Sequence, residues 1–426
     1  MKRIFLGLLL ASGTLACAQT NSKLINVAEV RRIESVLASD SMQGRRAGTP
    51  GSDKAAAFIA AEFKKAGLQP VANGSYLQSF SVFKPKFLGL EATVNGAAFD
   101  SRNVIVVTTQ PEVALTQASG YETVTVSAGD DLSGKVMGAL QGGKNAVVLI
   151  DTSFAKTFPR LQSLKRQLFQ GTPNVVFMLT ADKPSAYSVK ATHSFEETRM
   201  ANVVGILPGK AKKAEQVIFS GHYDHLGLGK AVNGDSIYNG ANDDAAGTTA
   251  VIMLANHFKK QNNNERTLVF AAFTAEEVGG FGATYFSRQF DPAKVAAMFN
   301  IEMIGTESKW GKNSAYITGF EKTDMGAILQ RNLEGTGFTF HPDPYPDQQL
   351  FYRSDNATLA RLGVPAHTIS TSKMDSEKFY HTVDDEVETL DMDNMAAIIE
   401  AIAKSSASII SGKDSPSRVK QEDLKR

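Results

Sequence analysis

The second half of the chain alternates short apolar runs with longer amphipathic segments. The apolar runs have the length of strands and show little polar alternation; they are residues 202–207, 216–219, 266–274, 295–303 and 363–369. Such runs are typical of strands that are buried on both faces. Segments with helical spacing of apolar residues lie between or after them, at 245–260, 324–333 and 392–408. This order predicts an α/β fold with a mostly parallel mixed sheet and helices on both faces.

The first 90 residues add two predicted helices to this fold. Apolar positions recur at helical spacing in residues 26–37 and again in residues 53–66. The intervening stretch 41–52 is punctuated by Gly and Pro, and we expect it to be a loop. Arg45 and Arg46 lie in this stretch, and we expect both side chains to be solvated.

Residues 91–199 have a different pattern, with short β-rich runs separated by Gly-rich turns and one helical segment near residues 158–169. The segment contains a single histidine, His193, and no cluster of catalytic residue types. Domain sizes favour a small inserted domain over one continuous domain. The main domain would then be discontinuous, formed by residues 19–90 and 200–410. Residues 411–426 are charged and without apolar period, which predicts a solvated tail.

The N-terminal residues resemble a secretory signal peptide at positions 1–18. Lys2 and Arg3 precede an apolar run, and Ala16 and Ala18 give a small-x-small cleavage pattern. The apolar run is too short to span a membrane. We therefore expect a secreted or periplasmic protein, with lipid anchoring at Cys17 as a less favoured alternative. Cleavage after Ala18 would leave a mature chain without cysteine, which excludes thiolate chemistry.

Composition gives no positive evidence for any binding partner and argues against nucleic acid. The chain has 426 residues, 42% hydrophobic residues and a formal net charge of +1. These values are ordinary for a soluble globular protein and provide no electrostatic footprint for nucleic acid. Function must therefore be argued from particular side chains.

Histidines and acidic residues follow the ends of successive predicted strands. Ligands of open α/β sheets bind beyond the carboxyl ends of the strands, so these side chains are expected to meet there. In chain order they are His222 and Asp224, then Asp243 and Asp244, then Glu276 and Glu277, then Glu302, and finally His381, Asp384 and Asp385. Each alone has an ordinary explanation, such as a helix N-cap or a solvated acid, but the ordered set indicates a site.

Histidines and carboxylates without thiolates are ligand types for Zn²⁺ or a similar divalent ion. A carboxylate on a turn can bridge two ions, which lower the pKa of a shared water, and a further carboxylate can act as general base. Glu276 and Glu277 suit such a division because the chain can direct two adjacent side chains differently beyond a strand.

These motifs, in this order, resemble the secreted di-zinc aminopeptidase family of bacteria, relatives of glutamate carboxypeptidase and glutaminyl cyclases. The likeness covers about residues 27–90 and 200–410. The resemblance implies a bridging role for Asp243, a general base at Glu276 and a carbonyl-polarising role for Tyr380. It implies that the remaining metal ligands are His222, Glu277, Glu302 and His381. The inserted segment is similar in place and strand content to a protease-associated domain.

One position departs from the family pattern. Glu302 stands where the family usually has Asp, and we expect its longer side chain to retract and still bind metal. Asp224 is expected to orient His222, and Asp385 to do the same near His381. His225 is expected on the loop side, away from the metal.

The predicted function is a secreted exopeptidase with two zinc ions, most simply an aminopeptidase acting on peptide substrates. Two alternatives stay open: a glutaminyl cyclase, which is an acyltransferase with one zinc, and an inactive binding module of the same fold. A serine hydrolase is disfavoured because the chain has no Gly-x-Ser-x-Gly motif.

Overall fold

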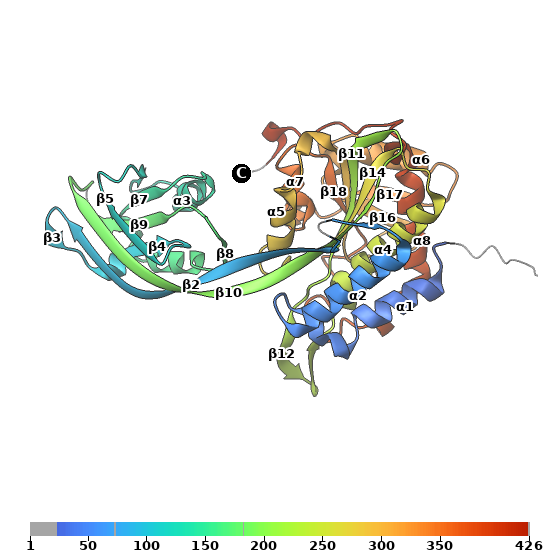
Figure 1. The fold of residues 1–426 in the computed structure, drawn as a ribbon, viewed down its shortest axis with the longest axis horizontal. Helices are drawn as coiled ribbons and strands as arrows, with labels where there is room; N and C mark the ends of the chain where they lie inside the picture. Colours follow the sequence, from blue (N-terminus) through green and yellow to red (C-terminus); the bar gives the residue numbers. More distant parts are fainter. Residues whose placement is uncertain (1–23, 72–73, 182, 425–426) are drawn as a thin grey trace, which may run out of the picture.

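The computed structural model describes residues 24–71, 74–181 and 183–424. It shows a large α/β lobe and a smaller lobe, joined by a long two-stranded ribbon (Figure 1). The predicted signal peptide and Cys17 lie outside the described residues. None of the helices in the described ranges has both the length and the apolar character needed to cross a membrane.

A mixed sheet forms the centre of the large lobe and extends into the ribbon. Its strands run in the order β17 (Thr339–Pro342), β16 (Ser314–Ile317), β18 (Ala366–Ser370), β15 (Val295–Ile301), β11 (Lys212–His222), β14 (Arg266–Phe273), β10 (Tyr187–Leu207), β2 (Leu77–Val94), β3 (Ala97–Ala98). The four central strands, β18 to β14, are parallel to one another, whereas β10 and β16 flank them antiparallel. The predicted fold class is confirmed.

Both faces of this sheet are covered, which explains the continuous apolar runs. Along β11, Val217 and Phe219 belong to one buried cluster and Ile218 to another on the opposite face. Among the described residues, six helices contribute to the cluster on the first face: α1 (Val27–Leu37), α2 (Pro50–Ala66), α4 (Ala246–Gln261), α6 (Met325–Asn332), α8 (Met392–Ser405) and the short α9 (Ala407–Ile410). The short helices α5 (Phe281–Ser287) and α7 (Asn356–Ala360) contribute to the second (Figure 1).

The smaller lobe contains its own four-stranded sheet and hydrophobic clusters. Its strand order is β4 (Val104–Val107), β9 (Val175–Thr180), β7 (Ala146–Asp151), β6 (Glu122–Val126), with helix α3 (Leu132–Gln141). Strands β2 and β10 pair antiparallel along most of their length and connect this lobe to the large one. Both strands run through the boundaries predicted at residues 90 and 200. Three short strands pair with the ribbon strands β2 and β10: β1 (Gln69–Pro70), β5 (Glu112–Thr116) and β8 (Leu168–Phe169). Strands β12 (Gly227–Val232) and β13 (Asp235–Tyr238) form a separate hairpin.

The predictions for two segments are wrong in part. The stretch 41–52 is mostly structured, with a 3₁₀ turn at Asp40–Arg45 and helix α2 beginning at Pro50. Arg45 is fully buried, in contrast to the expected solvated side chain, while Arg46 is exposed. The helical segment near 158–169 is a 3₁₀ helix at Phe158–Leu164 followed by β8.

The predicted solvated tail is mostly exposed over residues 411–424, but Pro416 and Val419 are buried. Val419 is buried in the second cluster. Arg266 is 2% exposed at its side chain and donates hydrogen bonds to the Asp414 carbonyl and the Ser415 hydroxyl. The segment therefore packs against the large lobe, anchored by a buried arginine that the charge pattern did not reveal.

Candidate metal centre and active site

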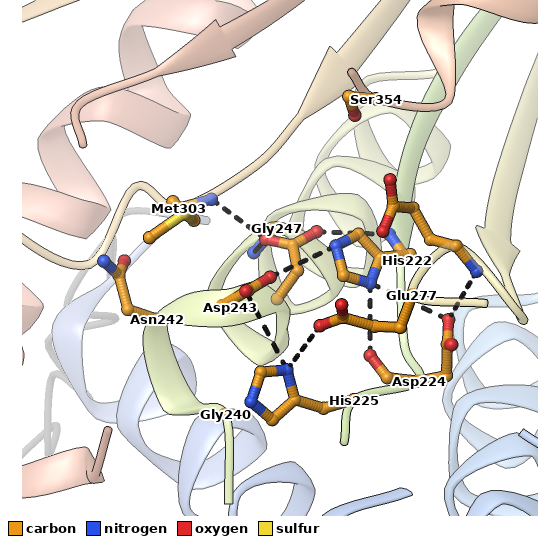
Figure 2. A network of polar contacts seen from close by, with 12 residues as sticks. His222, Asp224, His225, Gly240, Asn242, Asp243, Gly247, Glu277, Met303 and Ser354 are labelled. Carbon is orange, nitrogen blue, oxygen red and sulfur yellow. Dashed lines mark hydrogen bonds and ion pairs between the residues drawn. The ribbon is translucent and has the colours of Figure 1, made fainter. Parts of the chain in front are cut away.

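The predicted site residues meet at the carboxyl end of the parallel strands. His222 ends β11, Glu276 and Glu277 follow β14, and Glu302 follows β15. Asp243 lies on the turn that leads into α4. In Figure 2 the side chains of His222, Asp243 and Glu277 converge on one space. The structure thus brings together residues that are up to 159 positions apart, from His222 to His381.

One group of potential ligands consists of His222, Asp243 and Glu302. Their ligand atoms lie within 4.8 Å of one another. His222 Nε2 is 3.3 Å from Asp243 Oδ1, and both side chains are buried. Glu302 reaches this group from the end of β15 despite its extra methylene.

A second group uses the other oxygen of Asp243. His381 Nε2 lies 3.2 Å from Asp243 Oδ2 and 3.3 Å from Glu277 Oε2. Asp243 therefore faces both groups, one with each carboxylate oxygen, which is the geometry that a bridging ligand requires.

His225 also belongs to this centre, so its expected place on the loop side is wrong. Its ring is fully buried, with Nδ1 2.8 Å from Glu277 Oε1 and 3.9 Å from Asp243 Oδ2. His225, Asp243 and Glu277 form a compact triad of potential ligand atoms (Figure 2). Strand β11 ends at His222, and the loop that follows it turns His225 inward.

Asp224 supports the centre through two different groups. Its main-chain carbonyl lies 3.1 Å from His222 Nδ1, and its carboxylate accepts a hydrogen bond from the Glu276 N–H at 3.1 Å. The carboxylate itself is 3.7 Å from His222 Nδ1. Because a carbonyl only accepts, Nδ1 carries the proton and Nε2 is left free for a metal. The predicted orientation of His222 is thus achieved by the backbone of Asp224, while its side chain holds Glu276.

Asp385 holds the turn that carries Asp243. Its two carboxylate oxygens accept hydrogen bonds from the main-chain N–H groups of Asn242 at 2.8 Å and Asp243 at 3.0 Å. The expectation that Asp385 orients His381 is therefore wrong. Both oxygens of the Asp385 carboxylate bind the turn at Asn242 and Asp243 and not the His381 ring.

Asp244 was not assigned a role from the sequence, yet it links three segments of the site. Its carboxylate accepts hydrogen bonds from the N–H groups of His222, Gly247 and Met303 at 3.0 to 3.1 Å. The bond to Gly247 is the ordinary contact of an acid at a helix start, so the bonds to His222 and Met303 are the ones that link Asp244 to the rest of the site.

Helix α4 approaches β15 closely at Gly247. A Cβ at Gly247 would lie 2.1 Å from the Ile301 carbonyl, so this approach requires glycine.

Arg45 is a second organising residue without a sequence signal. Its buried guanidinium donates hydrogen bonds to the carbonyl oxygens of Tyr223, Asn239 and Gly240 at 2.5 to 2.8 Å. These carbonyls flank the segments that carry His222 and Asp243. The arginine therefore ties the two segments together from behind.

Charge at the centre is divided between ionised ligands and a carboxyl that favours its proton. Burial raises the pKa of Glu276 well above its usual range, opposed by His222 and assisted by Glu302 and Asp355. Burial alone would raise the pKa of Glu277, but contacts with His225 and His381 outweigh it and lower the pKa to about 2. Contacts with Asp243 and Glu277 raise the pKa of His381 to about 10. The pKa values of the adjacent Glu276 and Glu277 are thus shifted in opposite directions, so Glu276 favours the protonated form and Glu277 the ionised form.

Asp355 was missed by the sequence reading. It is buried, and neither carboxyl oxygen has a hydrogen-bond partner among the described residues. Burial raises its pKa to about 8, and the charge of His222 opposes this. A carboxyl with these properties holds a proton close to Glu276 and Glu302.

The donor set fits zinc. His222 Nε2, His381 Nε2 and Glu302 Oε2 are buried atoms that form no hydrogen bond with any described residue. Buried polar atoms without partners are costly, and a bound cation would satisfy them. Imidazole nitrogens and carboxylate oxygens without sulfur match catalytic zinc sites.

Tyr380 lines the cavity that contains Glu276, Glu302 and His381. Its ring stacks on His381 with 3.9 Å between ring centroids and 19° between planes. Burial raises its pKa, so the phenol keeps its proton and can donate a hydrogen bond.

Comparisons with known proteins support the resemblance inferred from the sequence. Residues 202–406 match the family model described as Peptidase family M28. A probable leucine aminopeptidase of Trichophyton verrucosum is 27% identical over 223 residues, which cover 50% of this chain and 58% of the relative. The match thus spans somewhat more than half of that relative's length.

Two solved structures share the fold across nearly the whole chain. An aminopeptidase from Aneurinibacillus sp. strain AM-1 has a TM-score of 0.54 at 18% identity, with 94% of this chain and 97% of that chain covered. A zinc aminopeptidase from Bacillus subtilis has a TM-score of 0.55 at 16% identity, with coverages of 94% and 99%. The predicted resemblance is confirmed at the level of family match and fold.

Proposed function

Because residues 202–406 match Peptidase family M28, we propose that this protein is a zinc-dependent aminopeptidase with two metal ions. Its substrates would be peptides with a free N-terminus. The observation that carries the proposal is the placement of Asp243 between two groups of buried ligands, with one oxygen directed at each. Relatives named leucine aminopeptidase and zinc aminopeptidase support the reaction class.

The residues assigned to the two ions follow from these distances. His222, Asp243 and Glu302 would hold one ion, and Asp243, Glu277 and His381 would hold the other. When bound, such ions polarise a carbonyl and lower the pKa of a water near them. The low pKa of Glu277 keeps that ligand ionised for its role.

Glu276 would act as the general base. Its main-chain N–H is fixed by Asp224, so its carboxylate is held beside the ligands without being one of them. It would take a proton from the attacking water and then donate it to the leaving amine. The environment that raises its pKa favours the protonated state that the second step needs.

Tyr380 would stabilise the oxygen of the scissile carbonyl. Its phenol keeps its proton and lines the same cavity as Glu276. A hydrogen bond to an oxygen that gains negative charge is worth most in the transition state.

The test is a metal count combined with an activity panel. Purified protein should contain two zinc ions per chain and should cleave leucine p-nitroanilide and free dipeptides, but not N-acetylated ones. Chelation should abolish turnover and added zinc should restore it. One zinc with cyclisation of N-terminal glutamine would identify a glutaminyl cyclase instead. Absence of any metal-dependent reaction would leave a binding module.

We also propose that the chain is exported and cleaved after Ala18. The basic start, apolar run and small-x-small pattern support this. N-terminal sequencing of the protein recovered outside the cytoplasm should begin at Gln19. A lipid-modified Cys17 at the N-terminus would establish anchoring instead.

A further inference from the structure

Two cavities extend from the Glu276–Glu277 pair in different directions. The first, of about 60 Å³, is lined by Tyr316, Thr368 and Tyr380 and holds the metal-ligand side chains. The second, of about 510 Å³, also borders Glu276 and Glu277 but leads away from the ligands along α7. The first cavity lies at the metal ligands, where the residue that an aminopeptidase releases would be held, so the second is left for the rest of the peptide.

The larger cavity continues towards the smaller lobe. A third cavity, of about 280 Å³, shares Arg166 and Val278 with it. Arg166 lies between the 3₁₀ helix Phe158–Leu164 and β8, outside the residues that form the metal centre. We name the second and third cavities, which adjoin at Arg166 and Val278, the basic groove.

The basic groove becomes positively charged with distance from the metal centre. Its inner part contains Glu276, Glu277 and Asp355 together with three arginines, Arg166, Arg353 and Arg361. Its outer part is lined by Arg46, Lys84 and Arg166 and by no acidic residue among those described.

These cations have no acidic partners within ion-pair distance in the part of the chain that the structure describes. The Arg353 guanidinium donates to Gln348 Oε1, and that of Arg46 to the Leu226 carbonyl, both at a long 3.3 Å. The side-chain nitrogens of Arg166, Arg361 and Lys84 form no hydrogen bond or ion pair with another described residue; the one side chain bonded to Arg361, that of Gln421, donates to its main-chain carbonyl. Cations from both lobes line this groove without forming an ion pair, and no acidic residue lines its outer part, so the outer part favours an anionic occupant.

We propose that the basic groove binds the leaving part of the peptide substrate and selects for a carboxylate there. This inference rests on the proposed function and adds the substrate class. The carboxylate could be the free C-terminus of a short peptide or an acidic side chain, since a guanidinium recognises both in the same way. If Arg166 binds a free C-terminus, the substrate can extend only a few residues beyond the cleaved bond, so the protein would act on short peptides.

The experiment compares kcat/KM for matched substrates with the native, zinc-loaded protein. Leu-Gly-Gly and its C-terminal amide test the α-carboxylate, and Leu-Gly-Glu-amide against Leu-Gly-Gln-amide tests the side chain. Leucine p-nitroanilide has no carboxylate in its leaving group and monitors the metal centre alone. We expect the acidic member of at least one pair to be favoured about fivefold at low salt, because exposed charge pairs contribute modestly, and the preference to shrink as salt screens it.

Variants then assign the preference to the groove. Arg166→Ala combined with Lys84→Ala should reduce the preference to near unity, and Arg166→Glu should reverse it, while p-nitroanilide turnover and zinc content stay unchanged. Arg160→Ala is the matched control because Arg160 is an exposed arginine on the 3₁₀ helix just before Arg166 and lines neither cavity. Equal rates within both pairs, or a preference that survives in the double variant, would overturn the inference. Failure to cleave any substrate, p-nitroanilide included, would instead overturn the proposed function, and this inference with it.

Discussion

His225 Nδ1 lies 2.8 Å from Glu277 Oε1, and the two side chains meet inside the protein with His225 fully buried. The same Glu277 carboxylate faces His381 through its other oxygen, at 3.3 Å. Glu277 is therefore held between two histidines. His225 is in a position either to bind the second ion directly or to fix the carboxylate that does.

We predict that His225→Ala weakens zinc binding at the second site while the first stays occupied. Loss of a residue that holds a metal ligand typically lowers affinity about 10- to 100-fold. Competition with a chelator of known affinity should show one weakened and one normal zinc. His257→Gln is the control, because His257 lies on α4 and is absent from both ligand groups. Two equally tight zinc ions in the His225 variant would contradict the prediction.

Glu276→Gln should keep two zinc ions and lose most hydrolysis. The amide preserves shape but cannot accept the proton of the attacking water, and general-base catalysis contributes roughly 10²- to 10⁴-fold. Turnover of leucine p-nitroanilide and zinc content should be measured on the same preparation. Near-normal turnover would remove Glu276 from the role of base.

The sequence predicted the fold and the first set of site residues because both depend on short-range patterns. Strand β14 was expected at 266–274 and is found at Arg266–Phe273, since a run buried on both faces is apolar throughout. Each predicted ligand except His381 follows such a run or a turn beside it, and His381 lies in the loop between β18 and α8. Glu302 follows the apolar run of β15, and the structure brings it together with His222 and Asp243.

The residues that support these ligands could not be predicted in this way. Asp385 binds main-chain N–H groups 142 and 143 positions away, and Arg45 binds carbonyls up to 195 positions away. Main-chain partners leave no trace in the identities of the residues that provide them. The role of an acid or arginine of this kind is fixed by the tertiary fold, and its surrounding sequence resembles that of a solvated loop.

Asp385→Ala should destabilise the turn that carries Asp243. The substitution leaves two buried N–H groups without an acceptor, and each unsatisfied group costs about 1–3 kcal/mol. Urea unfolding of the metal-free protein should show a lower free energy of unfolding than for the wild type. Asp384→Ala is the matched control, because Asp384 is the exposed neighbour. Equal stability of the two variants would show that solvent replaces the Asp385 carboxylate.

Glu34, which is not one of the metal ligands, is expected to make folding stability depend on pH. It is fully buried on α1, accepts a hydrogen bond from the Thr249 hydroxyl at 2.7 Å, and its other oxygen, Oε1, has no partner among the described residues. Burial raises the pKa of Glu34 to about 8 from an ordinary value of 4.5. Between these two pH values the folded state retains a proton that the unfolded state has released.

Folding stability must therefore fall as pH rises from about 4.5 to about 8, because stability decreases wherever the folded state binds more protons. Glu34→Gln keeps an acceptor for Thr249 and removes the titration. We expect the variant to match the wild type near pH 4.5 and to exceed it by a few kcal/mol at pH 8, since one pKa unit corresponds to about 1.4 kcal/mol. Urea titrations of both metal-free proteins at pH 5, 6.5 and 8 measure the difference. Parallel pH profiles would mean that the Glu34 carboxyl is ionised in the folded state, held so by the nearby charge of Arg45.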